Sequence, residues 1–122
     1  MDKTVLLIED EPNIIEAISF ILVRDGWRVA THSNGVDAVG AVATRRPDLV
    51  ILDVMLPGRS GYDILRDLRA AEETAELPVL MLTARGQTRD REMAEQLGAS
   101  RFMAKPFSNA EMLEAVNDLV RS

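Results

Sequence analysis

Polar side chains able to hold a metal ion or a phosphoryl group follow four apolar stretches of this sequence. Glu9 and Asp10 come directly after the first stretch, and Asp53 ends a run of four apolar residues. Thr83 and Lys105 follow two later stretches. Because parallel strands joined by right-handed crossovers end at the same edge of a sheet, we expect these five side chains to surround one crevice.

Together these side chains favour phosphoryl chemistry. Two carboxylates about 4 Å apart repel by about 4 kcal/mol at an effective dielectric constant of about 20, so a carboxylate cluster either raises its pKa values or binds a cation. A site of oxygen ligands without His or Cys favours Mg²⁺ or Mn²⁺. Thr83 could donate a hydrogen bond to a phosphoryl oxygen and Lys105 could neutralise its charge. Asp53 is then a candidate nucleophile that forms an aspartyl phosphate.

The elements that position these residues alternate between strand and helix. Apolar and β-branched segments predict strands at 4–8, 27–31, 48–53, 79–82 and 101–104. Helical spacing and end signals predict helices that begin near Pro12, Val36, Ser60, Thr88 and Ser108. The alternation predicts a doubly wound α/β fold rather than a barrel, with no linker and no second domain within residues 1–122.

Composition is that of an ordinary globular domain. The chain has 122 residues, of which 47% are hydrophobic and 28% charged, and it contains no cysteine. No apolar run approaches the roughly 20 residues that a bilayer requires, and the first residues do not resemble a signal peptide. We therefore expect a cytoplasmic protein with no membrane partner. The net charge of −6 argues against direct nucleic-acid binding and favours a basic or cationic partner.

Four short motifs resemble the receiver domain of bacterial two-component response regulators, and the likeness covers the entire chain. The motifs are Glu9-Asp10, Leu52-Asp53-Val54-Met55-Leu56-Pro57-Gly58, Thr83-Ala84 and Lys105-Pro106-Phe107. The resemblance implies a flavodoxin-like five-stranded parallel sheet in the order 2-1-3-4-5 with five helices. It also implies a cis peptide bond between Lys105 and Pro106, and a single receiver domain at 1–122 with no output domain.

The same resemblance implies roles for the clustered residues. Asp53 is expected to be the phosphoacceptor. Asp10, Asp53 and the backbone carbonyl of Met55 are expected to bind Mg²⁺ directly, with Mn²⁺ as a substitute, while Glu9 acts through water. Lys105 is expected to contact the phosphate. Many relatives carry two aspartates where this chain has Glu9 and Asp10, and that variation is common in the family.

Receiver domains are switches, so the resemblance also implies an output. Thr83 is expected to be the switch hydroxyl and Phe102 the switch aromatic. The donor would be a sensor histidine kinase or a histidine phosphotransfer protein. The output surface would be the face formed by the helix at 88–97, the strand at 101–104 and the last helix, and it would bind a downstream protein or a second copy. The chain would not be an enzyme in the usual sense, but a phosphoacceptor that promotes its own Mg²⁺-dependent phosphorylation and dephosphorylation.

The stretch from Thr83 to Arg91 particularly resembles receivers attached to winged-helix transcription factors, which dimerise through that face. Arg91 and Glu111 match one of their charge pairs. Arg101 stands where those relatives usually carry an acid, and Ala115 where they usually carry arginine. One alternative is therefore a receiver module excised from a DNA-binding transcriptional regulator, and another is a different protein partner at this surface.

Two positions bear on the lifetime of a phosphoaspartate. In the family, the residues two beyond the phosphoacceptor and two beyond the threonine influence hydrolysis, and here they are Met55 and Arg85. Neither offers a carboxylate or an amide that could orient water. We expect a phosphorylated state that lasts long enough for a slow output.

Simpler and competing interpretations remain open on sequence alone. Asp53 could merely end a strand, the acids at 9–11 could only favour a helix N-terminus, and Phe102 could be an ordinary core aromatic. A haloacid-dehalogenase-type phosphatase also uses Asp after a parallel strand with Mg²⁺, but it expects a second carboxylate where this chain has Met55. A flavin or nucleotide binder would need a glycine-rich phosphate loop after the first strand, which is missing.

Overall fold

The fold is a parallel five-stranded sheet with helices on both faces. The computed structural model describes residues 3–84 and 88–121. The strands lie in the order β2-β1-β3-β4-β5, and all neighbours pair in parallel. Their bounds are β1 Lys3–Ile8, β2 Trp27–His32, β3 Leu49–Asp53, β4 Val79–Thr83 and β5 Arg101–Ala104. Both the predicted fold class and the predicted strand order are confirmed.

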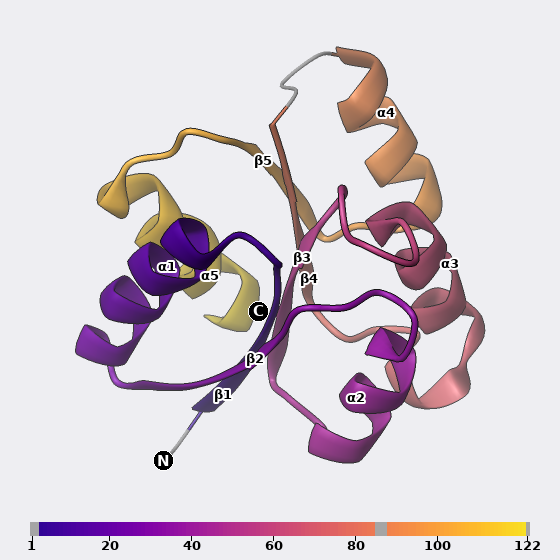
Figure 1. Ribbon diagram of the computed structural model, residues 1–122, viewed down its shortest axis with the longest axis horizontal. Helices are drawn as coiled ribbons and strands as arrows, with labels where there is room; N and C mark the ends of the chain where they lie inside the picture. Colours follow the sequence, from indigo (N-terminus) through magenta and orange to yellow (C-terminus); the bar gives the residue numbers. More distant parts are fainter. Residues whose placement is uncertain (1–2, 85–87, 122) are drawn as a thin grey trace.

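Two layers of helices cover the sheet. Figure 1 shows α1 and α5 on one face of the sheet and α2, α3 and α4 on the other. Their bounds are α1 Pro12–Arg24, α2 Ala38–Arg45, α3 Gly61–Ala70, α4 Thr88–Leu97 and α5 Asn109–Arg121. Each face has its own hydrophobic cluster, because side chains of every strand alternate between the two layers. All five residues of β3 are buried, as expected for a central parallel strand.

The helices that frame the reactive edge begin at sequence-coded caps. Pro12 starts α1, where its missing N–H costs no hydrogen bond. Ser60 caps α3 by accepting a hydrogen bond from the Asp63 amide at 3.2 Å. Ser108 and Glu111 form a reciprocal capping box before α5, with both bonds at 3.0 Å.

One local prediction, the start of the second helix, needed correction. The second helix begins at Ala38 rather than near Val36, because the Asn34 side chain accepts a hydrogen bond from the Val36 amide at 2.7 Å and closes a turn there. A short 3-10 helix, Glu72–Thr74, follows α3.

The expected cis peptide bond between Lys105 and Pro106 is present. Within residues 3–84 and 88–121, no helix has the length and apolar character needed to cross a bilayer.

Candidate functional site

The carboxyl ends of the central strands bring the predicted polar residues together. Glu9 follows β1, Asp53 ends β3, Thr83 ends β4 and Lys105 follows β5. Glu9, Asp53 and Thr83 are 0%, 3% and 2% exposed. The four residues therefore lie at the same edge of the sheet, as the sequence predicted.

Lys105 links two of the carboxylates. Its Nζ lies 2.8 Å from Glu9 Oε1 and 3.4 Å from Asp53 Oδ1. The backbone of Lys105 is fixed beside β4, because its amide donates to the Thr83 carbonyl oxygen at 2.7 Å. Sequence reasoning expected Lys105 at a phosphate and did not foresee its pairing with Glu9. No local signal could have revealed that contact, which joins opposite ends of the chain.

The acidic residues suit a hard cation. One carboxylate oxygen from each of Glu9, Asp10 and Asp53 lies within 4.8 Å of the others. The second oxygen of Glu9 accepts hydrogen bonds from the Asp10 and Glu11 amides, both at 3.2 Å, so that side chain is held on both sides. Asp10 is exposed and leaves the cluster open to solvent. An oxygen-only set with one open side fits Mg²⁺, which usually keeps several of its waters.

The charges around Asp53 alter its protonation. Burial and the neighbouring charge of Glu9 raise the pKa of Asp53 to about 6, although Lys105 opposes the shift. Burial would lower the pKa of Lys105, but the hydrogen bond to Glu9 and the charge of Asp53 outweigh it, so that pKa is raised. A divalent cation beside Asp53 would favour its ionised, nucleophilic form.

Met55 lies in the loop that leads from Asp53 to α3. Met55 is 69% exposed, and its amide is 3.4 Å from Asp53 Oδ1. The loop is drawn against the strand end, because the Gly61 amide donates to the Val54 carbonyl oxygen at 2.8 Å. The expected coordination through the Met55 carbonyl stays a prediction.

The two expected switch residues lie on adjacent strands. Thr83 pairs in register with Ala104, two residues beyond Phe102. Phe102 is largely buried, and the guanidinium carbon of Arg91 from α4 lies 5.4 Å from the centre of its ring. The Phe102 ring thus belongs to the hydrophobic cluster and also reaches the surface beneath Arg91. A core role and a switch role are both compatible with this position.

A groove of about 750 Å³ runs along the predicted output surface, which we call the α4-β5-α5 face. Phe102 is one of its lining residues, Arg91 and Arg101 contribute positive charge, and Glu111 and Glu114 from α5 contribute negative charge. Arg101 pairs with Asp118 of the same chain at 3.0 Å. Arg85 was also expected to influence the site, but it lies outside the described residues.

Comparison with known families agrees with this geometry. The model of the response regulator receiver domain matches residues 5–117. This chain belongs to that family. As a receiver domain, it is a module of two-component systems, and its acidic cluster of Glu9, Asp10 and Asp53 corresponds to the place where receivers bind Mg²⁺. The phosphatase and flavin-binding alternatives find no support in this match.

The receiver resembles two transcriptional regulatory proteins. It is 42% identical over 118 residues to the regulatory protein TcrX of Mycobacterium tuberculosis, with 97% of this chain and 50% of that protein covered. It is 37% identical over 121 residues to the transcriptional regulatory protein PhoP of Bacillus subtilis, with 99% and 50% covered. The chain spans about half the length of these curated relatives. Because both relatives are named as transcriptional regulatory proteins, the expectation that nucleic acid is not a partner is unsupported.

A solved structure supplies a metal-bound comparison. The receiver domain of a sensor histidine kinase from Pseudomonas aeruginosa has a TM-score of 0.91 and 33% identity, with the whole of both chains covered. That structure holds a magnesium ion in its active-site cleft. The similarity extends over the full fold and includes the edge of the sheet that carries Asp53.

Proposed function

We propose that this receiver accepts a phosphoryl group on Asp53 in the presence of Mg²⁺ and signals through its α4-β5-α5 face. The observation that carries the proposal is the position of Lys105, whose ammonium lies 3.4 Å from Asp53 Oδ1 beside a three-carboxylate cluster. With Mg²⁺ bound to the cluster, Asp53 would lie between the metal ion and the Lys105 ammonium. Phosphoryl transfer needs such positive charge around the transferred group. The donor would be a sensor histidine kinase or a histidine phosphotransfer protein.

Each residue of the site would have its own role in the phosphoryl transfer. Asp53 attacks phosphorus in line, so its oxygen–phosphorus bond forms as the nitrogen–phosphorus bond of the donor's phosphohistidine breaks. Lys105 then moves from a purely carboxylate environment to one that includes phosphoryl oxygens, and Thr83 donates its hydroxyl hydrogen to another of them. Asp10, Asp53 and the Met55 carbonyl would hold Mg²⁺, with Glu9 acting through water. When bound, that ion supplies charge neutralisation at the equatorial oxygens.

The output follows from the strand ends. Movement of Thr83 toward the phosphoryl group would open space near β5, and Phe102 could turn into it. Because Arg91 covers the Phe102 ring, such a turn would also displace Arg91 and reshape the groove. The partner at this face would be a downstream protein or a second copy. Arg101 already has Asp118 as an internal partner, so the Arg91 and Glu111 pair is the better candidate for a contact between copies.

The longer protein and the lifetime of the signal are also proposals. We infer that residues 1–122 are a single receiver domain, and that it serves as a module of a DNA-binding transcriptional regulator, because its curated relatives are named as transcriptional regulatory proteins. A cytoplasmic location stays a prediction. Met55 and Arg85 offer no carboxylate or amide to orient an attacking water, so the phosphoaspartate is expected to last long enough for a slow output. Loss of the phosphoryl group within seconds would contradict this.

Incubation with Mg²⁺ and a small acyl phosphate tests the central proposal. Intact-mass spectrometry should show one added phosphoryl group on the wild type and none on Asp53→Ala. A chelator should prevent the addition. Continuous release of phosphate without a labelled protein would instead indicate a phosphatase, and labelling of Asp53→Ala would refute Asp53 as the acceptor.

A further inference from the structure

The turn between β2 and α2 touches the loop that carries Met55, although the two segments are separated in sequence by β3. The Gly35 amide donates a hydrogen bond to the Pro57 carbonyl oxygen at 3.0 Å. A methyl group built on Gly58 would lie 2.5 Å from a methyl carbon of Val36. Gly58 also has a φ of +83°, a conformation that favours glycine. The two turns are therefore packed against one another through their backbones.

Gly35 makes the closest approach. A Cβ atom built there would lie 2.4 Å from the Arg59 carbonyl oxygen and 3.1 Å from the Arg59 carbonyl carbon. These are backbone atoms, which cannot move aside as a flexible side chain can. Gly35 is buried and its φ is outside the left-handed region, so its side-chain size alone limits what the position accepts.

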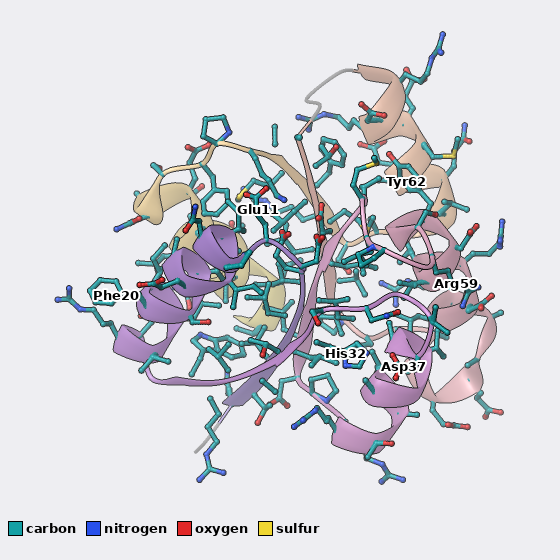
Figure 2. All side chains as sticks on the ribbon, in the orientation of Figure 1. Glu11, Phe20, His32, Asp37, Arg59 and Tyr62 are labelled. Carbon is teal, nitrogen blue, oxygen red and sulfur yellow. The ribbon has the colours of Figure 1, made fainter. Side chains whose placement is uncertain are left out.

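The far side of the same loop is also fixed. The Arg59 side chain, which lies beside α3 in Figure 2, is paired with Asp67 of that helix and donates to the Asp63 carbonyl oxygen at 3.4 Å. A Cβ atom on Gly61 would lie 2.2 Å from the Asp53 carbonyl oxygen, so the loop returns tightly to the strand end. If a larger side chain at Gly35 displaced the loop, the backbone between Asp53 and Arg59 would have to change conformation. That interval contains Met55.

Met55 itself has little to hold it. Met55 is 69% exposed, and within residues 3–84 and 88–121 its amide makes only the long 3.4 Å bond to Asp53 Oδ1. The position of its carbonyl is thus set by the loop as a whole. Mg²⁺ demands nearly ideal octahedral geometry with ligands at about 2.1 Å, so a small shift of one ligand lowers affinity.

We propose that the turn Asn34-Gly35-Val36 is a positioning element that holds the loop after Asp53 in the conformation that Mg²⁺ binding requires. The inference rests on the proposed function, because it assumes that Met55 contributes its carbonyl to the metal. It adds residues that touch neither the metal nor the phosphoryl group and belong to no recognised receiver motif in this sequence. Their effect is exerted through Pro57, Gly58 and Arg59.

The test compares two glycine-to-alanine variants by isothermal titration with Mg²⁺ alone. Gly35→Ala should bind Mg²⁺ roughly 10- to 100-fold more weakly than the wild type, the usual effect of losing support behind a metal ligand. Gly40→Ala is the matched control, because it lies in α2 with nothing within 4 Å of an added Cβ. It should bind as the wild type does. A merely structural role for Gly35 would lower the free energy of unfolding and leave the Mg²⁺ affinity unchanged.

A further variant separates this inference from the proposed function. If Asp10→Asn binds Mg²⁺ as tightly as the wild type, the proposed metal site is wrong and the positioning role falls with it. If Asp10→Asn loses binding but folded Gly35→Ala retains wild-type affinity, only the positioning role is overturned.

Should circular dichroism show that Gly35→Ala does not fold, Asn34→Ala takes its place. That change removes the exposed side chain whose oxygen accepts the Val36 amide at 2.7 Å, and it adds no bulk. Binding weakened several-fold supports the positioning role, and unchanged affinity overturns it.

Discussion

The Lys105 ammonium lies 2.8 Å from the carboxylate of Glu9, a side chain with no exposed surface. This pair joins the two ends of the chain across the reactive edge. Replacement of Lys105 by Met would leave Glu9 and Asp53 buried without their cation. We expect the free energy of unfolding of Lys105→Met to fall by about 3 kcal/mol in the absence of metal. Urea unfolding with a chelator measures the loss.

Two comparisons sharpen that measurement. Lys3→Met removes an amine at the opposite edge of the sheet and should cost much less. Added Mg²⁺ should restore part of the stability of Lys105→Met, because the ion would neutralise the same carboxylates. Equal losses in the two lysine variants would contradict a stabilising role for the Lys105 pair.

The protonation of Asp53 predicts a pH dependence in the metal-free protein. Its pKa is raised from 3.8 to about 6 by burial and by the charge of Glu9. Folding therefore favours the protonated form. The stability that it contributes is complete below about pH 4 and is lost as the pH rises from about 4 to about 6. Asp53→Asn removes this loss.

We expect Asp53→Asn to become more stable than the wild type as the pH increases, by on the order of 2 kcal/mol at pH 7. Urea unfolding at several pH values, with a chelator present, gives the two profiles. Parallel profiles for the two proteins would show that Asp53 does not titrate as its surroundings indicate.

Arg69 connects three segments at the edge opposite the reactive site. Its guanidinium donates to the carbonyl oxygens of Gly98 at 2.8 Å and Thr74 at 2.9 Å, and to Ser100 Oγ at 3.3 Å. Arg69→Met should lower the free energy of unfolding by about 2 kcal/mol, because three acceptors lose a charged donor. Arg66→Met, on the exposed side of the same helix, should cost less than about 0.5 kcal/mol. Similar losses in both variants would contradict this role.

The stacking of Arg91 on Phe102 predicts energetic coupling between α4 and β5. The guanidinium carbon lies 5.4 Å from the ring centre. A double-mutant cycle with Arg91→Gln and Phe102→Leu should yield a coupling energy of about 0.5–1 kcal/mol. Phosphorylation of Asp53 should reduce that coupling if the Phe102 ring turns away from Arg91. A coupling energy near zero in the unphosphorylated protein would show that the contact does not stabilise the fold.

Sequence reasoning located the site because the rules that place it are topological. Once the apolar segments are assigned to parallel strands, Asp53, Thr83 and Lys105 must share an edge whatever the details of packing. Cap residues such as Ser60 and Ser108 were also readable, because a cap acts within a few residues of its own position.

Contacts between distant loops were not readable in the same way. Asn34-Gly35 and Pro57-Gly58 each signal a turn, but nothing local states that the two turns meet. Arg69 carries no motif, and its three acceptors come from segments placed by the whole fold. The early start predicted for the second helix had a similar cause, since Val36 fits a helical pattern and yet lies in the turn that packs on Gly58.

The sheet divides the interior into two hydrophobic clusters that face different helices. The backbone of the sheet therefore separates substitutions in the α1 and α5 layer from those in the α2, α3 and α4 layer. The effects of well-separated substitutions on the free energy of unfolding are usually additive. Descendants of this sequence could exchange one layer gradually while the other kept its composition. The fold could thus bind new partners through one layer of helices without changes to the residues around Asp53.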